Sequence, residues 1–517
     1  MFCVLCYVMA FSMDFATAIK PTFKQAIVYP QILEGRSEDG VQVLKLNDDL
    51  ILRLVQEPAY RGQLLLRTTK DDGTHLYQHV LGPEYNKNLF VDRQEMASLV
   101  VDDEDGVQVR GIIGEDLRIK PLLERERSEE GHVAHLLYRE KRHGTKDRVA
   151  TYNTLKRHGA VSAVRPEGDV SSRDEVIPDQ RSDVHLVLEI HIVIDSTYYA
   201  QFKKRKDDII VYFGAALNAI NLRYETLEGI TARIAITGFT FNENGRDEPY
   251  VKPLGRYTQY SNLTGTQGAF RDHYNKDSLK PQADAMVLVT GKPLCTVERI
   301  NGQRMADCNY GGIAYGGVPC GNNGYAVCTD TAHSYAIVRI MAHELGHILG
   351  CVHDGEKPME YIEGHPGAES CPWRDGFIMT YVENSTNQFN FSTCCSDQIK
   401  HVARSNGSHC LYKNNTAKLI SNSHYLPGSN VTLNHICGQL RTRIRFQHDT
   451  SGQIEGCKVP CISEDRSQRR DAFAQDGSLC DFKNYTMICI GGRCVYDERF
   501  FPFTDFDDYY DDDYEVC

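Results

Sequence analysis

The feature that most constrains this chain is the stretch 343–354, which reads H-E-x-x-H-x-x-G-x-x-H-D. His343 and His347 are four residues apart, so on a helix their imidazoles share one face and can hold one Zn²⁺ ion. Glu344 directly follows the first histidine, a position that suits a general base acting on water. This half of the stretch therefore predicts a helix that carries two metal ligands and a base.

The second half of the stretch predicts a turn and a third ligand. Gly350 allows the helix to stop and the chain to reverse, which brings His353 toward the same ion. Three protein ligands leave one position open, as in catalytic zinc sites. Apolar residues at spacings of three and four predict that the helix covers 332–349. The alternative is a core helix with incidental histidines, and the length of the motif argues against it.

Two further segments carry a family resemblance. Residues 377–381, Phe-Ile-Met-Thr-Tyr, resemble the Met-turn of the metzincin metalloproteases. Asp354 and the segment Phe391–Ser396 resemble the reprolysin (adamalysin) branch, which includes the ADAM and ADAM-TS proteases. Within that branch the chain resembles the secreted salivary metalloproteases of ticks. The resemblance is strongest over 280–412.

The resemblance implies an α/β metzincin catalytic domain: a mixed twisted sheet with a zinc-site helix and a Met-turn. It implies structural roles for Gly350, Asp354 and Met379, the last packing near the zinc without binding it. Tyr381 departs from the usual reprolysin pattern. Met-x-Tyr is the arrangement of astacins and serralysins, in which the tyrosine hydroxyl aids the transition state, and the alternative here is a packing tyrosine.

Other expectations also come from the resemblance. Glu189 and Asp284 match two acidic ligands of a structural Ca²⁺ site, but Lys413 stands where a third, polar ligand is expected. The resemblance favours a disulfide between Cys328 and Cys410. It also gives 312–320 as the edge strand that pairs with a substrate peptide, with a plain loop as the alternative.

Local patterns outline the catalytic domain, expected over 185–413. Apolar runs predict strands at 186–195, 232–237 and 285–290, and a helix is expected over 202–222. Strands that alternate with helices indicate an α/β sheet.

Targeting signals and cysteines indicate a secreted protein. Residues 1–18 read as a signal peptide, and no later stretch is apolar and long enough for a membrane anchor. Of the 18 cysteines, the last sixteen all follow residue 294, as in disulfide-stabilised extracellular proteins. A formal net charge of −13 argues against nucleic-acid binding. The N-x-S/T glycosylation sequons are Asn262, Asn384, Asn390, Asn406, Asn414, Asn430 and Asn484.

The region 19–184 is interpreted as a β-rich propeptide with a linker. Alternating apolar runs such as 41–46 and 50–54 predict strands, and residues 140–184 turn polar. Arg139–Arg142 fits the R-x-K-R pattern that secretory convertases cut. Asp169, in a Gly-Asp pair that resembles a latency element of astacins, is a hypothetical zinc blocker. The alternative for Asp169 is a turn in the linker, and the alternative for the whole region is a permanent β-rich N-terminal domain.

The region 414–517 is expected to be a disulfide-rich, disintegrin-like or cysteine-rich small domain. It holds seven cysteines and the catalytic region nine, so at least one bridge would cross between them if all paired. An acidic tail over 504–515 reads as a solvated segment, with tyrosine sulfation as the alternative.

The predicted function is that of a secreted zinc metalloendopeptidase with one catalytic Zn²⁺. By resemblance its substrates are extracellular host proteins such as fibrinogen, fibrin or matrix proteins, with impaired haemostasis at a blood-feeding site as the result. The competing hypothesis is a toxin-like binding protein that acts through its cysteine-rich region. The intact His343, Glu344, His347 and His353 favour the enzyme. The oligomeric state stays open.

Overall fold

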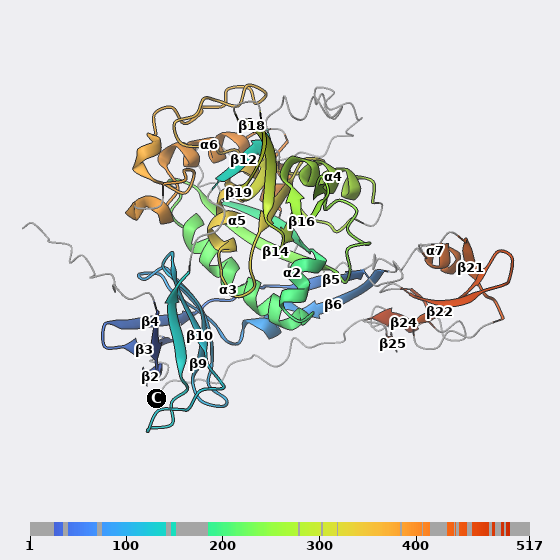
Figure 1. Cartoon of the computed structure of the whole chain (residues 1–517), viewed down its shortest axis with the longest axis horizontal. Coiled ribbons are helices and arrows are strands. Elements are labelled where there is room, and N and C mark those ends of the chain that lie inside the picture. The colour runs from blue at the N-terminus through green and yellow to red at the C-terminus, as the bar shows by residue number, and fades with distance from the viewer. Residues whose placement is uncertain are drawn as a thin grey trace, which may run out of the picture.

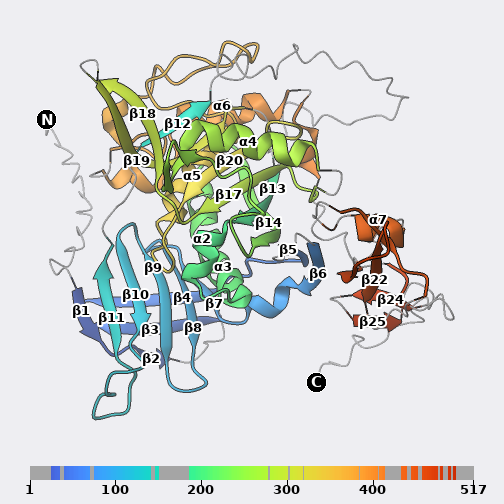
Figure 2. The same ribbon diagram turned by 45° about the vertical axis from the view of Figure 1, so that its right-hand side comes forward.

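The computed structural model of the chain describes residues 25–34, 40–69, 75–140, 146–150, 185–277, 280–300, 303–317, 319–382, 385–405, 407–413, 432–438, 440, 444–451, 457–474, 478–480, 487–490 and 493–496. Two large sheets and a small C-terminal module make up this part of the chain (Figure 1). In both ribbon views the N-terminal sheet and the C-terminal module lie on opposite sides of the central sheet and its helices (Figure 2).

The N-terminal sheet is antiparallel and curls around its own apolar core. Its strand order is β1-β11-β10-β9-β8-β7-β4-β3-β2. The strands are β1 (Gln25–Val28), β2 (Gln31–Glu34), β3 (Val41–Asn47), β4 (Leu50–Gln56), β7 (Leu89–Asp92), β8 (Ala97–Asp102), β9 (Gln108–Ile113), β10 (Leu117–Pro121) and β11 (His135–Arg139). The predicted strands at 41–46 and 50–54 are confirmed as β3 and β4.

The central sheet is mixed, with the order β15-β16-β18-β19-β20-β17-β13-β14-β5-β6 and with β12 paired to β19. Its strands are β5 (Gln63–Thr69), β6 (His75–Leu81), β12 (Lys146–Ala150), β13 (His185–Ile194), β14 (Thr231–Asn242), β15 (Pro253–Leu254), β16 (Tyr257–Asn262), β17 (Ala285–Thr290), β18 (Leu294–Ile300), β19 (Gln303–Tyr315) and β20 (Tyr325–Thr329). The predicted strands at 186–195, 232–237 and 285–290 are confirmed as β13, β14 and β17.

Helices cover the central sheet. They are α2 (Ser196–Gln201), α3 (Lys206–Tyr224), α4 (Leu263–Asn275), α5 (Ile337–Ile348) and α6 (Thr393–Ala403), with the 3₁₀ turns η1 (Gly82–Asn86), η2 (Trp373–Asp375), η3 (Thr386–Phe389) and η4 (His409–Tyr412). The helix expected over 202–222 is confirmed as α3, but it begins at Lys206, because Lys203 and Lys204 take positive φ angles of 54° and 57° just before it. Helix α3 is buried along nearly its whole length, since it packs on β14, on α5 and on the N-terminal strands.

The C-terminal module holds α7 (Leu433–Gly438), β21 (Phe446–His448), β22 (Lys458–Ser463), β23 (Arg469–Phe473), β24 (Met487–Ile490) and β25 (Arg493–Tyr496). Three disulfides lie in its core: Cys437–Cys461, Cys457–Cys489 and Cys480–Cys494. This small cysteine-rich core agrees with the expected disulfide-rich domain.

Residues 185–413 hold four disulfides, which correct one sequence-based prediction. They are Cys295–Cys308, Cys320–Cys410, Cys351–Cys395 and Cys371–Cys394. The predicted Cys328–Cys410 pair is wrong: Cys410 bonds to Cys320, and Cys328 is a free, fully buried thiol on β20. Each of the seven bridges stays within one region, so none of those in the described residues crosses between the two; Cys517 lies outside the described residues.

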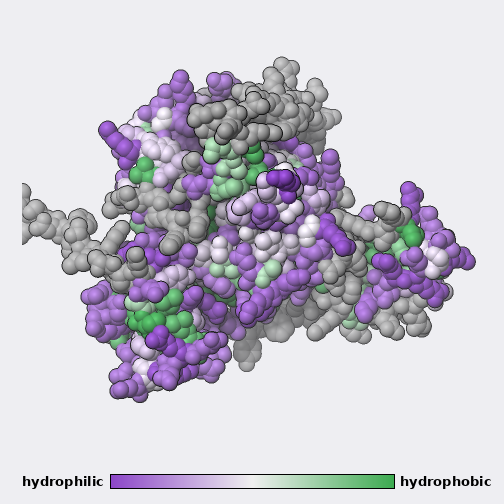
Figure 3. Space-filling model, viewed as in Figure 1, coloured by the Kyte–Doolittle hydropathy of each residue, from purple (hydrophilic) through white to green (hydrophobic). Residues whose placement is uncertain are grey.

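The visible surface is mostly hydrophilic, with an apolar patch over the N-terminal strands (Figure 3). The large exposed apolar side chains of β1, β2 and β4 are Ile27, Leu33, Ile51 and Val55. Among the described residues, no helix is both long and apolar enough to cross a membrane.

Candidate active site

Helix α5 presents His343 and His347 on one face, as the spacing predicts. Their Nε2 atoms lie 3.1 Å apart, and both side chains are buried. The helix begins at Ile337 rather than at 332, because His333 and Tyr335 take positive φ angles just before it. At its other end Gly350, at φ 114°, reverses the chain, and a Cβ there would lie 2.4 Å from Val402 on α6. Only glycine therefore allows this tight approach.

The reversal brings His353 to the pair. One nitrogen each from His343, His347 and His353 lie within 4.8 Å of one another, and this is one of the two groups of possible metal ligands found among the described residues. The other comprises Cys457, Cys480 and Cys489, which are all committed to disulfides.

Each imidazole is oriented through its Nδ1 atom. His343 Nδ1 lies 2.7 Å from the carbonyl oxygen of Ile378, and His347 Nδ1 lies 2.6 Å from that of Cys351. His353 Nδ1 lies 3.1 Å from Oε1 of Glu356. An acceptor at Nδ1 holds the proton there, which leaves the Nε2 lone pair for a metal. These residues therefore fit a zinc ion.

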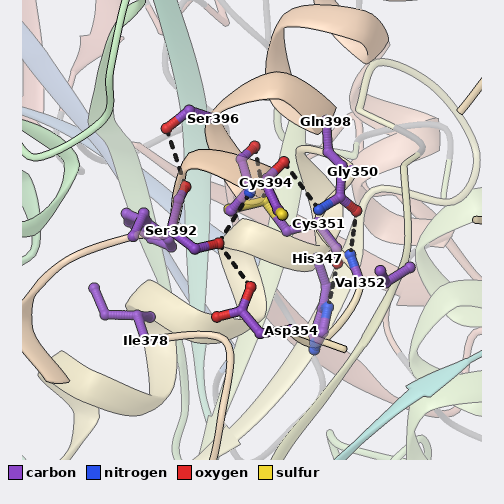
Figure 4. Close-up of a disulfide and its surroundings, with 12 residues drawn as sticks. His347, Gly350, Cys351, Val352, Asp354, Ile378, Ser392, Cys394, Ser396 and Gln398 are labelled. Atoms are coloured by element: carbon purple, nitrogen blue, oxygen red, sulfur yellow. Dashed lines mark hydrogen bonds between the residues drawn. A yellow bond between two sulfur atoms is a disulfide. The ribbon is translucent and has the colours of Figure 1, made fainter. Parts of the chain in front are cut away.

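Disulfide Cys351–Cys395 fastens the reversed chain to α6 (Figure 4). Beside it, Val352 N donates to Oε1 of Gln398 at 2.8 Å. The Ser392 hydroxyl donates to Oδ1 of Asp354 at 2.6 Å, while Ser392 Oγ also accepts from Cys395 N and so caps α6. Burial raises the pKa of Asp354 to about 6, although the hydrogen bond from Ser392 opposes this shift. Asp354 thus links the third histidine to α6.

The Met-turn lies beneath α5. Met379 is fully buried, and a Cβ on Gly346 would lie 3.0 Å from its sulfur. The Met379 carbonyl accepts from Asp354 N at 3.1 Å, which ties the turn to the loop of the third histidine. Met379 therefore contacts the site by packing.

Glu344 lies against strand β19. Its side chain is buried, and a Cβ on Gly312 would lie only 2.3 Å from Glu344 Oε1. Residues 312–315 form the end of β19, so the expectation of a strand in this glycine-rich segment is confirmed for them, while β19 ends at Tyr315. Because Gly312 has no side chain, the Glu344 carboxylate can approach β19 closely.

Two aromatic residues complete the surroundings of His353. The Tyr381 hydroxyl lies 3.3 Å from His353 Nε2. The ring of Trp373 lies edge-on to His353 and to Tyr381, with centroids 5.8 Å and 5.0 Å away. Neither Trp373 nor Glu356 was predicted from the sequence, because both approach His353 only through the fold of the loop.

Glu189, on β13, and Asp284, just before β17, are brought together. Asp284 Oδ2 accepts from Glu189 N at 2.9 Å, and both side chains are buried. Burial raises the pKa of Asp284 to about 7; the hydrogen bond from Glu189 N opposes the shift and the Glu189 charge adds to it.

The structure describes two of the seven predicted glycosylation sequons, Asn262 and Asn390. Asn262 caps α4 and, like Asn390, is partly buried. The remaining sequons, together with Asp169 and the acidic tail, lie outside the described residues: Asn384, Asn406, Asn414, Asn430 and Asn484.

The site combines three histidines with converging nitrogens and a buried glutamate on α5, and it lies against a mixed sheet. This combination is typical of a metal-dependent peptidase. Residues 185–392 match the family model described as metallo-peptidase family M12, of the reprolysin type. A venom metalloproteinase of Tityus fasciolatus, described as antarease-like, is 30% identical over 44% of this chain and 97% of its own length. This chain belongs to metallopeptidase family M12, and that membership confirms the predicted class, a metalloendopeptidase.

Two longer matches extend beyond the catalytic region. The venom metalloproteinase antarease of Tityus serrulatus is 26% identical over 76% of this chain and 94% of its own length. A Bombyx mori protein described as like a disintegrin and metalloproteinase with thrombospondin motifs is 26% identical over 89% of this chain. The chain spans 63% of the length of that Bombyx protein.

Proposed function

We propose that this protein is a secreted zinc endopeptidase that cuts extracellular proteins. The observation that carries the proposal is the convergence of His343, His347 and His353, with Glu344 next to the first of them on α5. The domain assignment belongs to the same proposal: signal peptide 1–18, propeptide and linker 19–184, catalytic domain 185–413, and cysteine-rich region with an acidic tail 414–517.

The chain's own residues have distinct tasks in peptide-bond hydrolysis. A zinc ion held by the three imidazoles would supply Lewis acidity toward water and the scissile carbonyl. Glu344 removes a proton from the attacking water as the new carbon–oxygen bond forms, and then delivers it to the leaving amine as the carbon–nitrogen bond breaks. The buried position of Glu344 beside Gly312 keeps its carboxylate next to the strand along which a peptide would lie.

Tyr381 is proposed to assist this step. Its hydroxyl lies at the metal-facing nitrogen of His353, so it can donate to the carbonyl oxygen of a bound peptide as negative charge develops there. Packing by Trp373 restricts the orientation of the Tyr381 ring.

Substrate is proposed to bind at strand β19. Residues 312–314 pair with β20 on one side, so the other side offers backbone groups to an extended peptide. In this structure that side pairs with β12, in parallel register over 146–150. A segment between the N-terminal sheet and the catalytic region thus occupies the proposed substrate edge.

The substrates are proposed to be host proteins such as fibrinogen, fibrin or matrix proteins, with impaired haemostasis as the consequence. Support comes from relatives described as venom metalloproteinases. The competing proposal is a binding protein that acts through its cysteine-rich region; the complete set of metal ligands and base favours the enzyme.

Two accessory features are part of the proposal. Glu189 and Asp284, paired and buried, are proposed to contribute to a structural Ca²⁺ site. The seven sequons are proposed to carry N-linked glycans.

The experiment is digestion of fibrinogen and gelatin by the processed protein, beside a Glu344→Gln variant and a chelator-treated sample. Cleavage is expected from the wild type alone, with recovery when zinc is returned to the chelated sample. A zinc-loaded, correctly processed wild type that leaves both proteins intact, together with tight binding of either one by the Glu344→Gln variant, would favour the binding protein instead.

A further inference from the structure

The N-terminal region, residues 25–140, and the catalytic region, residues 185–413, share one hydrophobic core. One cluster of buried apolar residues contains side chains from β13, β14, α3 and α5 together with seven from the N-terminal region. The seven are Ala59, Tyr60, Leu64, Leu66, Leu89, Val100 and Ile112. Apolar surface buried in this way resists separation of the two parts in water.

Strand pairing joins the same two regions. Strand β5 pairs in parallel with β14, from Leu65 opposite Gly238 to Thr69 opposite Asn242, and β6 completes the hairpin. A Cβ on Gly238 would lie 2.1 Å from the Leu65 carbonyl oxygen. Strand β14 therefore has its outer edge covered by the N-terminal region and carries a glycine where the two backbones come closest.

Helix α3 packs closely against the N-terminal region. A Cβ on Gly214, in the middle of this helix, would lie 2.8 Å from a methyl carbon of Leu89. Tyr60 and Ser98 donate their hydroxyl protons to the α3 carbonyls of Ile210 and Ala215, at 2.5 Å and 2.8 Å. Glycine inside a helix is unfavourable unless close packing requires it, as Leu89 does here.

A buried carboxylate from the N-terminal region serves two helices of the catalytic region. Glu115 lies 3.3 Å from Arg223 of α3 and 3.9 Å from Arg339 of α5. The Arg223 side chain is 1% exposed and that of Glu115 is 6% exposed. Burial lowers the pKa of Arg223, and the Glu115 charge opposes that shift. Without Glu115 the Arg223 guanidinium would be a buried charge without its partner.

The turn that begins α5 also depends on this region. Arg118 donates from Nε to the carbonyl of Ser334 at 2.5 Å and from Nη2 to that of Tyr335 at 3.5 Å. Tyr335 has a positive φ of 54°, so its backbone needs such support. Arg118 itself is 4% exposed. The N-terminal region thus holds the entrance to the helix that carries His343, Glu344 and His347.

From these contacts we infer that residues 25–140 stay bound to the catalytic region after the chain is cut near Arg142, so that the mature protein is a complex of two fragments. The partner for this surface is the chain's own N-terminal region, which acts as a permanent subunit. The cut itself rests on the R-x-K-R pattern of residues 139–142 and belongs to the proposed function. The continued association of the two fragments is the new inference.

The test uses the complete folded chain with a recognition sequence for a site-specific protease inserted directly after Arg142. After complete cutting, gel filtration in native buffer is expected to give one peak that contains both fragments, which separate only in denaturant. Elution of the N-terminal fragment by itself in native buffer would overturn the inference. Neither outcome depends on peptidase activity, so the proposed function is tested separately.

A pair of variants tests the contacts that carry the inference. Glu115→Gln is expected to raise the dissociation constant of the cut complex at least about 100-fold, because it strips a buried arginine of its charge partner. Arg93→Gln is the matched control: Arg93 also bridges the two regions, to Glu225, but both side chains are 49% exposed. Its effect is expected to stay within about fivefold. Equal effects would contradict the role of Glu115, and if Glu115→Gln does not fold, the wild-type experiment still decides.

Discussion

The Nδ1 atom of His353 lies 3.1 Å from Oε1 of Glu356, three residues further along the same loop. The other carboxylate oxygen, Oε2, accepts from the His353 backbone N–H at 3.3 Å. Glu356 is therefore the carboxylate partner of the third histidine, whereas His343 and His347 rely on backbone carbonyls. A backbone carbonyl cannot be removed by substitution, but this carboxylate can.

Glu356→Ala is predicted to weaken zinc binding about 10- to 100-fold, because His353 loses the group that fixes its tautomer and orientation. Competition with a chromophoric chelator measures the affinity. Glu360→Ala, on the same loop and also exposed, is the control and is expected to leave it unchanged. If both variants bind zinc as the wild type does, Glu356 has no positioning role.

Tyr381→Phe is predicted to lower kcat/KM about 100-fold while zinc affinity stays the same. The reason is that the Tyr381 hydroxyl would donate its hydrogen bond to the substrate only in the transition state. The emission of Trp373, the chain's one tryptophan, provides a separate reading of zinc occupancy, since its ring lies edge-on to His353. Unchanged kcat/KM in a zinc-loaded variant would make Tyr381 a packing residue.

The Asp284 carboxyl predicts a dependence of stability on pH. With a pKa near 7 in the folded chain, against an ordinary value of 3.8, the folded state holds this proton more tightly than the unfolded state. The contribution of the protonated Asp284 carboxyl to the free energy of unfolding is fully present below about pH 4. It is lost as the pH rises toward 7, and the loss is on the order of 2–4 kcal/mol.

Asp284→Asn is therefore predicted to be more stable than the wild type in chelator at pH 8. If Glu189 and Asp284 bind Ca²⁺, millimolar calcium is expected to raise the wild-type Tm and to leave that of the variant in place. Thermal unfolding at pH 5 and 8, with and without calcium, measures both effects. Equal calcium responses would argue against the site.

The disulfide map predicts different costs for two neighbouring cysteines. Cys320→Ser opens a bridge that spans 90 residues and is expected to cost about 2–4 kcal/mol of stability. Cys328→Ala removes only a buried thiol and is expected to cost about 1 kcal/mol. Peptide mapping should recover Cys320 linked to Cys410, with Cys328 alkylated only after denaturation. A Cys328–Cys410 peptide would restore the original prediction.

Because β12 pairs with β19 at the proposed substrate edge, one cut is not expected to free that edge. A cut after Arg142 leaves residues 146–150 joined to the catalytic region and paired with β19. Full activity on a peptide substrate is therefore expected only after a second cut between 151 and 184. A variant with a site-specific protease sequence in that interval, compared with one cut only after Arg142, measures the difference. Equal activity would show that β12 does not block the edge.

Local features of the sequence were sufficient for the parts of the fold that depend on local patterns. The histidine spacing and apolar periodicity predicted α5, and continuous apolar runs predicted β13 and β17. The pairing of β5 with β14 joins residues far apart in the chain and leaves no periodic signal. The bridge to Cys410 was assigned to Cys328 because family resemblance does not show that Cys320, in the loop between β19 and β20, reaches Cys410 while Cys328 stays buried on β20.

Glu115 connects an arginine in α3 with one in α5, and this single carboxylate limits how the chain can be recombined. A chimera that joins the N-terminal region of one relative to the catalytic region of another would place foreign side chains around Arg223 and Arg339. Exchange at residue 185, the start of the family match, would divide a shared core and a continuous sheet. A junction at residue 185 is therefore expected to cost stability, whereas a chimera that takes both regions from one relative keeps the core and the sheet intact.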